Sequence, residues 1–188
     1  MAVSVSNIIV GEATIKIGDN ANATTIAAMN NFSDIGATSN GLEISWEPDM
    51  VDIEIDQFGD AAKIIQSKVK VMVKTTLAEG TLLNLTRAWN YDSTDVVSTQ
   101  DGASTQTFNF GTQGVIPAER ALVVTGTAPG STASSSKSRT FYAKRAISME
   151  SSTISMKRAE ATMFAVGFRI LPTVADTGYE YGKIVDQV

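Results

Sequence analysis

Two stretches of the sequence alternate apolar and polar residues, and this alternation constrains the fold more than any other feature. In residues 42–56, every second position is apolar on either side of Pro48. In residues 68–74, lysines alternate with valines, and Met72 is the one break on the polar face. A period of two predicts half-buried β-strands. Pro48 cannot donate to a sheet ladder, so it predicts an edge, a bulge or a corner.

One helix is predicted directly after the second alternating stretch. Thr76 and Glu79 fit a capping box, in which Thr76 is the N-cap and Glu79 the third helical residue. Apolar residues then follow at helical spacing up to Trp89, and Asn90 is a plausible stop.

The remaining chain predicts several shorter strands separated by polar loops. These strands are expected at residues 14–17, 107–110, 121–125, 141–149, 151–156 and 161–171. We therefore predict a mainly β fold, an antiparallel β-sandwich or barrel with one flanking α-helix.

A single domain is expected to span residues 1–188. Within it we expect a long loop around residues 47–66, a flexible loop at residues 126–139 and a C-terminal extension at residues 172–188.

Two residue types are absent from the sequence, and their absence limits the reactions that the chain could catalyse. The 188 residues include no Cys and no His, so thiol nucleophiles, disulfides and imidazole bases are missing. A catalytic role is therefore not expected, and neither is a cofactor. The net charge is −5, which does not favour a phosphate-binding surface. The first residues lack the basic segment of a signal peptide, and no apolar stretch is long enough to span a membrane, so synthesis in the cytoplasm is expected.

An ordered set of motifs resembles one known family. A GATSNG turn at residues 36–41 leads into LEISWEPDMVDIEIDQ, and KVKVMVKTTLAE at residues 68–79 leads to the helix that ends at AWN. Near the end, ATMFAVGFRILP at residues 161–172 fits a last core strand. With these motifs the chain resembles the major tail tube proteins of long-tailed bacteriophages.

The resemblance implies a β-sandwich flanked by a helix, with six subunits in a ring whose inner sheets join into a continuous barrel. Rings would stack into a virion tail tube in the bacterial cytoplasm, helped by a long loop that reaches the next ring. The implied partners are further copies of the chain, a tape-measure protein and tail terminator and tip proteins. DNA would pass through without specific binding.

Charge is segregated around the two alternating stretches. Residues 41–60 hold seven acids and no base, whereas residues 61–74 hold four lysines and no acid. Opposite charges could pair between neighbouring strands of one chain, or an acidic edge could meet a basic edge of another subunit. We expect the contacts between subunits and rings to involve Trp46, Glu47, Pro48, Asp49, Met50, Gln57, Phe58, Lys68 and Lys70.

Three further acids are relevant to the DNA channel that the resemblance implies. A channel that lets DNA slide should avoid lysine contacts with phosphate, so Asp52, Glu54 and Asp56 are predicted to face the lumen or the neighbouring joint. The same acids could suggest a metal site. Acids at alternate strand positions lie roughly 7 Å apart and converge poorly, however, so no metal is expected.

Alternatives from other classes are a β-sandwich adhesin and a carboxylate-only enzyme such as a glycosidase. A closer rival is the tube protein of a contractile tail or secretion machine. Trp46 and Trp89 are interpreted as core residues, with an interface role as the alternative, for which Trp46 is the better candidate.

Overall fold

The computed structural model describes most of the chain. The described residues are 11–18, 29, 32–56, 60–101, 103–111, 116–132, 134–150, 152–154, 158, 161–173 and 180–187.

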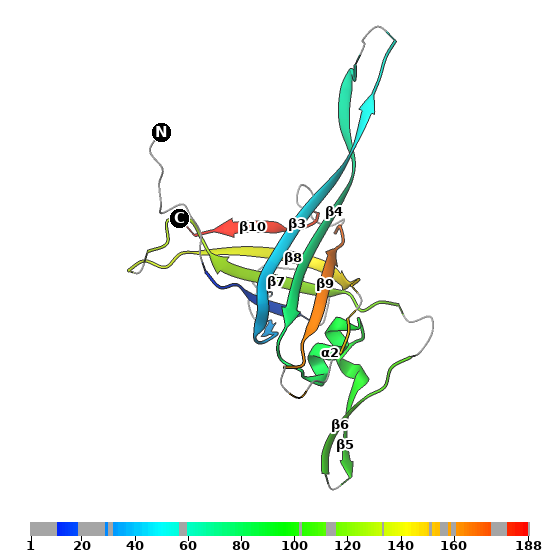
Figure 1. Cartoon of the computed structure of the whole chain (residues 1–188), viewed down its shortest axis with the longest axis vertical. Coiled ribbons are helices and arrows are strands. Elements are labelled where there is room, and N and C mark those ends of the chain that lie inside the picture. Colours follow the sequence, from blue (N-terminus) through cyan, green and yellow to red (C-terminus); the bar gives the residue numbers. More distant parts are fainter. Residues whose placement is uncertain are drawn as a thin grey trace.

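Nearly all strands belong to one antiparallel sheet, with the order β2-β1-β7-β8-β9-β4-β3 and with β10 paired to β8 (Figure 1). Its strands are β1 (Thr14–Gly18), β2 (Ser33–Asp34), β3 (Thr38–Ile53), β4 (Lys63–Leu77), β7 (Arg120–Thr127), β8 (Ser138–Ser148), β9 (Phe164–Ile170) and β10 (Lys183–Asp186). A separate hairpin contains β5 (Val96–Asp101) and β6 (Ala103–Phe108). The predicted mainly β class with one helix is confirmed for the described residues.

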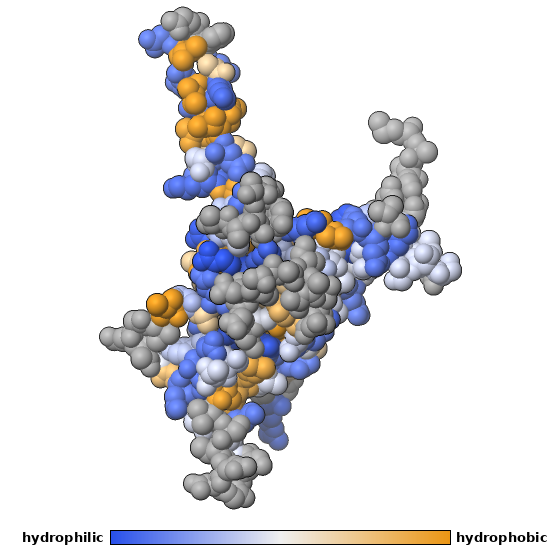
Figure 2. Space-filling model, turned by 180° about the vertical axis from the view of Figure 1, so that it is seen from behind, coloured by the Kyte–Doolittle hydropathy of each residue, from blue (hydrophilic) through white to orange (hydrophobic). Residues whose placement is uncertain are grey.

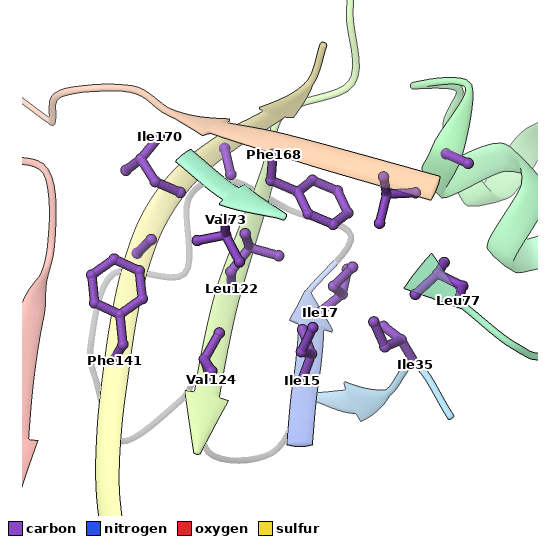
Figure 3. Close-up of a cluster of buried hydrophobic side chains, with 14 of the residues drawn as sticks. Ile15, Ile17, Ile35, Val73, Leu77, Leu122, Val124, Phe141, Phe168 and Ile170 are labelled. Atoms are coloured by element: carbon purple, nitrogen blue, oxygen red, sulfur yellow. The ribbon is translucent and has the colours of Figure 1, made fainter. Parts of the chain in front are cut away.

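The sheet changes direction along β8. This strand pairs with β7 over most of its length but with β9 only at residues 146–148. As a result, β9 and β4 cross over β1 and β7, and apolar side chains from these two pairs of strands pack in the space between the pairs (Figure 3). Both layers therefore belong to one bent sheet, and a sandwich or barrel stays a prediction.

The two ends of the sheet, β2 and β3, are joined by only three residues. In this link, the Ile35 N–H donates to the Ile15 carbonyl at 3.0 Å, and the Ala37 carbonyl accepts from the Ala78 N–H at 2.8 Å. Ile35 is buried in the core. The link thus holds the two layers of the bent sheet together by joining β2 of one layer to β3 of the other.

Helix α2 (Leu82–Ala88) begins later than the sequence predicted. Its N-cap is Thr81, whose side chain accepts from the Asn84 N–H at 3.1 Å. Thr76 instead lies in β4, and the Glu79 carboxylate accepts from the Ala37 N–H at 2.9 Å. The predicted capping box is therefore wrong, because both residues are used to close the sheet and its link.

Buried polar side chains attach α2 to the sheet. The Asn84 amide donates to the Ile35 carbonyl at 3.0 Å, and its oxygen accepts from the buried Arg87 guanidinium at 3.2 Å. The Ser148 hydroxyl in β8 donates to the Ala88 carbonyl at 2.9 Å. Hydrogen bonds of this kind fix where a helix sits, because leaving such groups unpaired in the interior would be costly.

Several predicted boundaries change. The predicted loop at 47–66 is largely strand, because β3 continues to Ile53 and β4 begins at Lys63. The predicted flexible loop at 126–139 shortens to residues 128–137, whose ends are joined by a 3.0 Å bond from the Ala128 N–H to the Lys137 carbonyl. No strand forms in the described part of the segment 151–156.

The C-terminal extension is docked through β10. Beside the strand pairing, the Arg139 guanidinium donates to both Asp186 carboxylate oxygens, at 2.7 and 2.6 Å. These hydrogen bonds hold the pKa of the Asp186 carboxyl below its ordinary value of 3.8. A lowered pKa means that the contact stabilises β10 above that value and that this contribution disappears as the pH falls through the lowered pKa.

We predict that Asp186→Asn accelerates amide hydrogen exchange in residues 183–187 at pH 7, because the charge-assisted bonds are lost. Wild type and variant compared at the same pH should converge once the pH falls well below 3.8. Glu12→Gln, which lies outside this contact, is the matched control. Equal exchange of wild type and Asp186→Asn at pH 7 would contradict the prediction.

Candidate assembly surface

The far part of the β3–β4 hairpin (residues 38–56 and 60–77) projects from the body along the long axis of the molecule (Figure 1). No residue of β3 is buried, and in β4 burial begins only at Val71. Within the described part of the chain, the outer edge of β3 has no strand partner. A long free edge is a template for pairing with another chain.

A β-bulge interrupts the hairpin halfway along. Asp49 faces Lys68, but the next residue, Met50, faces Gln66, so Ser67 is the extra residue on β4. The Ser67 hydroxyl donates to the Asp49 carbonyl at 3.3 Å. Pro48 lies directly before this bulge and on an edge strand, as its missing N–H predicted.

The apolar positions of β3 change sides at this bulge. Ile44 and Trp46 lie on the side that faces the core, opposite Val73 and Val71. Successive strand residues point to opposite sides, so Val51 lies on the other side of the ribbon. The residues beyond the bulge therefore do not continue the core. We call residues 50–56 and 60–65 the hairpin tip.

The lysines at the base of the hairpin stand opposite acids of the same chain. Glu47 lies across from Lys70 and forms an ion pair with it at 3.1 Å. Asp49 lies across from Lys68. The structure thus supports pairing within the chain for Glu47 and Lys70, and pairing of the others with a second subunit stays a prediction.

Register alone does not determine which carboxylate a lysine binds. Lys74 stands opposite Glu43, yet its ammonium group contacts Glu150 at 3.2 Å. Glu150 follows β8, which lies far from Lys74 in sequence. Lys74 therefore contacts Glu150, which the fold brings near it, although Glu43 stands opposite it on β3.

The three acids predicted to influence the channel are all exposed near the tip. Asp52 stands opposite Ile64, whereas Glu54 and Asp56 follow the end of β3. Over the whole tip, four acids and one lysine give a net charge of −3. The tip is acidic as well as apolar, and its orientation toward a lumen stays a prediction.

The remaining predicted contact residues have different outcomes. Trp46 is 58% exposed, so its interpretation as a core residue is wrong, and its role in an interface stays a prediction. Met50 is exposed on the same hairpin. Gln57 and Phe58 lie outside the described residues. Trp89 packs against the main core, which confirms its predicted place.

Large exposed hydrophobic side chains of the described residues fall into three groups. The hairpin group is Ile44, Trp46, Met50, Val51, Ile53, Ile55, Ile64 and Ile65. A second group, around α2, is Leu83, Phe110, Ile116, Met149 and Met163, and the third is Ile184 and Val185 on β10. Figure 2 shows apolar surface on the projecting hairpin and again toward the opposite end.

The second group adjoins a cluster of aromatic rings. Trp89 and Phe110 meet edge to face with centroids 5.1 Å apart, and Tyr91 and Phe108 do the same at 5.1 Å. Such contacts contribute about 0.5–1.5 kcal/mol each beyond area burial. We call these four residues, together with the neighbouring Met149, the aromatic patch.

The aromatic patch has a hollow beside it of about 520 Å³. Phe110 lies at its edge and is 66% exposed. The Tyr91 hydroxyl accepts from the Gly111 N–H at 2.9 Å, which fixes the segment after Phe110. The alternation of Phe108 and Phe110 was a signal for this site, but their contact with Trp89 requires the fold.

Other site types find no support among the described residues. They contain no group of three or more acidic residues that could hold a metal ion, and no helix long and apolar enough to cross a membrane. The chain matches no known family model and no curated protein.

Double-mutant cycles should show whether two charged residues are coupled because they stand opposite each other in the strand register or because their charged groups are in contact. We predict coupling of roughly 0.2–1 kcal/mol for Glu47 with Lys70 and for Lys74 with Glu150, as for exposed ion pairs. Coupling of Glu43 with Lys74 should be near zero. Urea unfolding of the Gln and Met variants measures these values. A Glu43–Lys74 coupling larger than that of Lys74–Glu150 would show that register decides.

Proposed function

We propose that this chain is a structural subunit of a bacteriophage tail tube, which assembles as hexameric rings stacked around a channel that conducts DNA. The observation that carries the proposal is the β3–β4 hairpin, which combines a free strand edge with exposed Trp46 and aliphatic side chains. Soluble monomers rarely expose a contiguous apolar surface of this kind unless it meets a partner. Its motifs are also those through which the sequence resembles tail tube proteins.

The free edge of β3 supports a continuous sheet between subunits. Along this 16-residue strand, alternate residues direct backbone N–H and carbonyl groups away from β4, and no strand of the described chain pairs with them. Addition of a strand from a neighbouring copy would satisfy them. In such a ring, the measuring protein, terminator, tip proteins and DNA would be partners only of the assembled tube.

The charges at the base of the hairpin are compatible with DNA passage. Lys68 and Lys70 stand opposite Asp49 and Glu47, so the lysines do not form an uncompensated basic surface. A surface without free cations gains little from counterion release on meeting DNA. The acids of the tip would add repulsion if they face the channel.

The first test is microscopy of the purified chain together with sedimentation velocity. We expect hexameric rings or hollow tubes at high concentration or after seeding. A strictly monomeric species under both conditions would overturn the proposal.

A paired substitution tests the hairpin directly. We predict that Val51→Ser with Ile53→Ser abolishes assembly, because it removes exposed apolar surface from the tip, while the melting temperature of the monomer changes little. The matched control is Val51→Ile with Ile53→Val, which keeps the positions apolar and should assemble normally. Tubes formed equally well by the serine variant would contradict the role of these residues.

The acids of the tip form a separate prediction. Replacing Asp52, Glu54 and Asp56 together by Lys should impair polymerisation or DNA passage with the fold retained, because the tip changes from negative to positive and attracts phosphate. Replacement by Asn and Gln is the control that removes charge without reversing it. Normal tubes together with normal infectivity of virions that carry the Lys variant would refute the electrostatic argument.

A further inference from the structure

The hollow beside the aromatic patch has the size and lining of a small-ligand site. Its volume is about 520 Å³, and pockets for small molecules typically measure roughly 300–1,000 Å³ and are lined mainly by apolar and aromatic side chains. Trp89 and Tyr91 line it as half-buried rings, and Phe110 is 66% exposed. No residue of the β3–β4 hairpin lines it. Assembly through the hairpin therefore gives no reason for these exposed rings.

The charges of the hollow favour an uncharged ligand. Of the residues that line it, only Glu150 is charged, and its carboxylate contacts the Lys74 ammonium group at 3.2 Å. The lining contains no lysine or arginine, so an anionic ligand would lose its hydration without a cation to replace it. A cationic ligand would have to compete with Lys74 for the one carboxylate.

The lining also holds polar groups that a ligand can use. The Ser152 hydroxyl oxygen is buried and has no hydrogen-bond partner among the described residues. A rotation about its Cα–Cβ bond can turn it toward the hollow without breaking a hydrogen bond. The Asn90 amide oxygen accepts from the Ser148 N–H at 3.4 Å, and its nitrogen donates to none of the described residues. A ligand that carries hydrogen-bonding groups at its edge would satisfy both side chains.

A pyranose sugar combines these properties in one molecule. It is uncharged, hydroxyl groups surround its ring, and its axial C–H groups form an apolar face. This face can pack on the exposed ring of Phe110, because the face of an aromatic ring is the negative part of its quadrupole. An apolar side chain of a partner protein could use the same rings, but it would leave Ser152 and Asn90 without partners.

We propose that the aromatic patch binds a neutral sugar unit, a hexose or an N-acetylhexosamine. Phe110 supplies the stacking surface, Trp89 and Met149 the apolar wall, and Ser152 and Asn90 the hydrogen bonds. The inference goes beyond the tube function and does not depend on it, because one chain contains the whole hollow. Sugar binding by a chain that stays monomeric would refute the tube and leave the sugar site standing.

Saturation-transfer difference NMR with the full-length chain tests the site. The probes are neutral disaccharides of glucose, galactose, mannose and N-acetylglucosamine, together with indole as an uncharged aromatic probe without hydroxyl groups. We expect saturation of at least one sugar, strongest at its ring C–H protons. Binding of indole but of no sugar would identify an apolar docking site and overturn the inference. Binding of neither probe would also overturn it.

Substitution of Phe110 connects binding to the hollow. Phe110→Ser should lower the affinity for the sugar by roughly tenfold or more, because the stacking surface is lost. Phe110→Tyr keeps the ring and should bind close to wild type. Ile184→Ser removes an exposed apolar side chain on β10, outside the hollow, and is the matched control. Wild-type affinity in folded Phe110→Ser, or an equal loss in Ile184→Ser, would refute binding at the aromatic patch.

Substitution of Ser152 distinguishes a sugar from an apolar group. Ser152→Ala should weaken sugar binding by about two- to tenfold, as expected for one lost hydrogen bond, and leave indole binding unchanged. Its melting temperature should stay the same or rise, because the variant lacks a buried hydroxyl without a partner. Unchanged sugar affinity would contradict the hydrogen bond on which the choice of a sugar depends.

Longer oligosaccharides distinguish two sources of the sugar. The disaccharide that binds best is titrated beside its longer oligomers by the same NMR method. Tighter binding of the oligomers would identify a polysaccharide, and equal affinity would identify a free sugar. Both results support the site, whereas loss of binding with every oligomer and every disaccharide in the presence of excess indole, but in Phe110→Ser as much as in wild type, would place the sugar elsewhere and overturn it.

Discussion

The continuity of β4 is the constraint on which the rest of the structure depends. From Val71 to Leu77 this strand pairs with β9 on one side and β3 on the other, and its inward side chains lie in the core. Toward Lys63 the same strand leaves the body and keeps only β3 as a partner. Because both parts belong to one hydrogen-bonded ribbon, packing around Val73 also fixes the direction in which the hairpin projects. An assembly surface held this way loses little conformational entropy on binding.

Patterns in short stretches of the sequence predicted those strands whose formation depends on the residues of the stretch itself. Alternation at residues 42–46 and 68–74 identified strands, since the period of side chains follows directly from strand geometry. The predicted capping box failed because Thr76 is paired on both sides within the sheet and Glu79 bonds the link at Ala37. A long loop was predicted around residues 47–66, although Pro48 by itself predicted only an edge, a bulge or a corner. The structure accommodates Pro48 on an edge, next to a bulge, so the strands continue.

The candidate site was predictable only in part, for the same reason. The segregation of acids and lysines could be read from the sequence, but not whether they pair within the chain or between subunits, and the structure pairs Glu47 with Lys70 within the chain. Trp46 resembled a core residue because it alternates in step with Ile44. Its strand partner Val71 is buried and has β9 as a second strand neighbour, however, whereas Trp46 lies on the last strand of the sheet and is exposed. The aromatic patch combines the end of α2 with segments that follow β6 and β8. No single stretch of the sequence contains a pattern that predicts contact between these segments.

Acids alternate with apolar residues along the hairpin tip. Alternate carboxylates keep an exposed aliphatic ribbon soluble, and the bulge at Ser67 interrupts the outer edge of β4 in the part that β9 does not pair. The same charges disfavour contact between identical tips. The apolar surface of the tip is therefore better matched to a partner surface without exposed carboxylates than to a second tip.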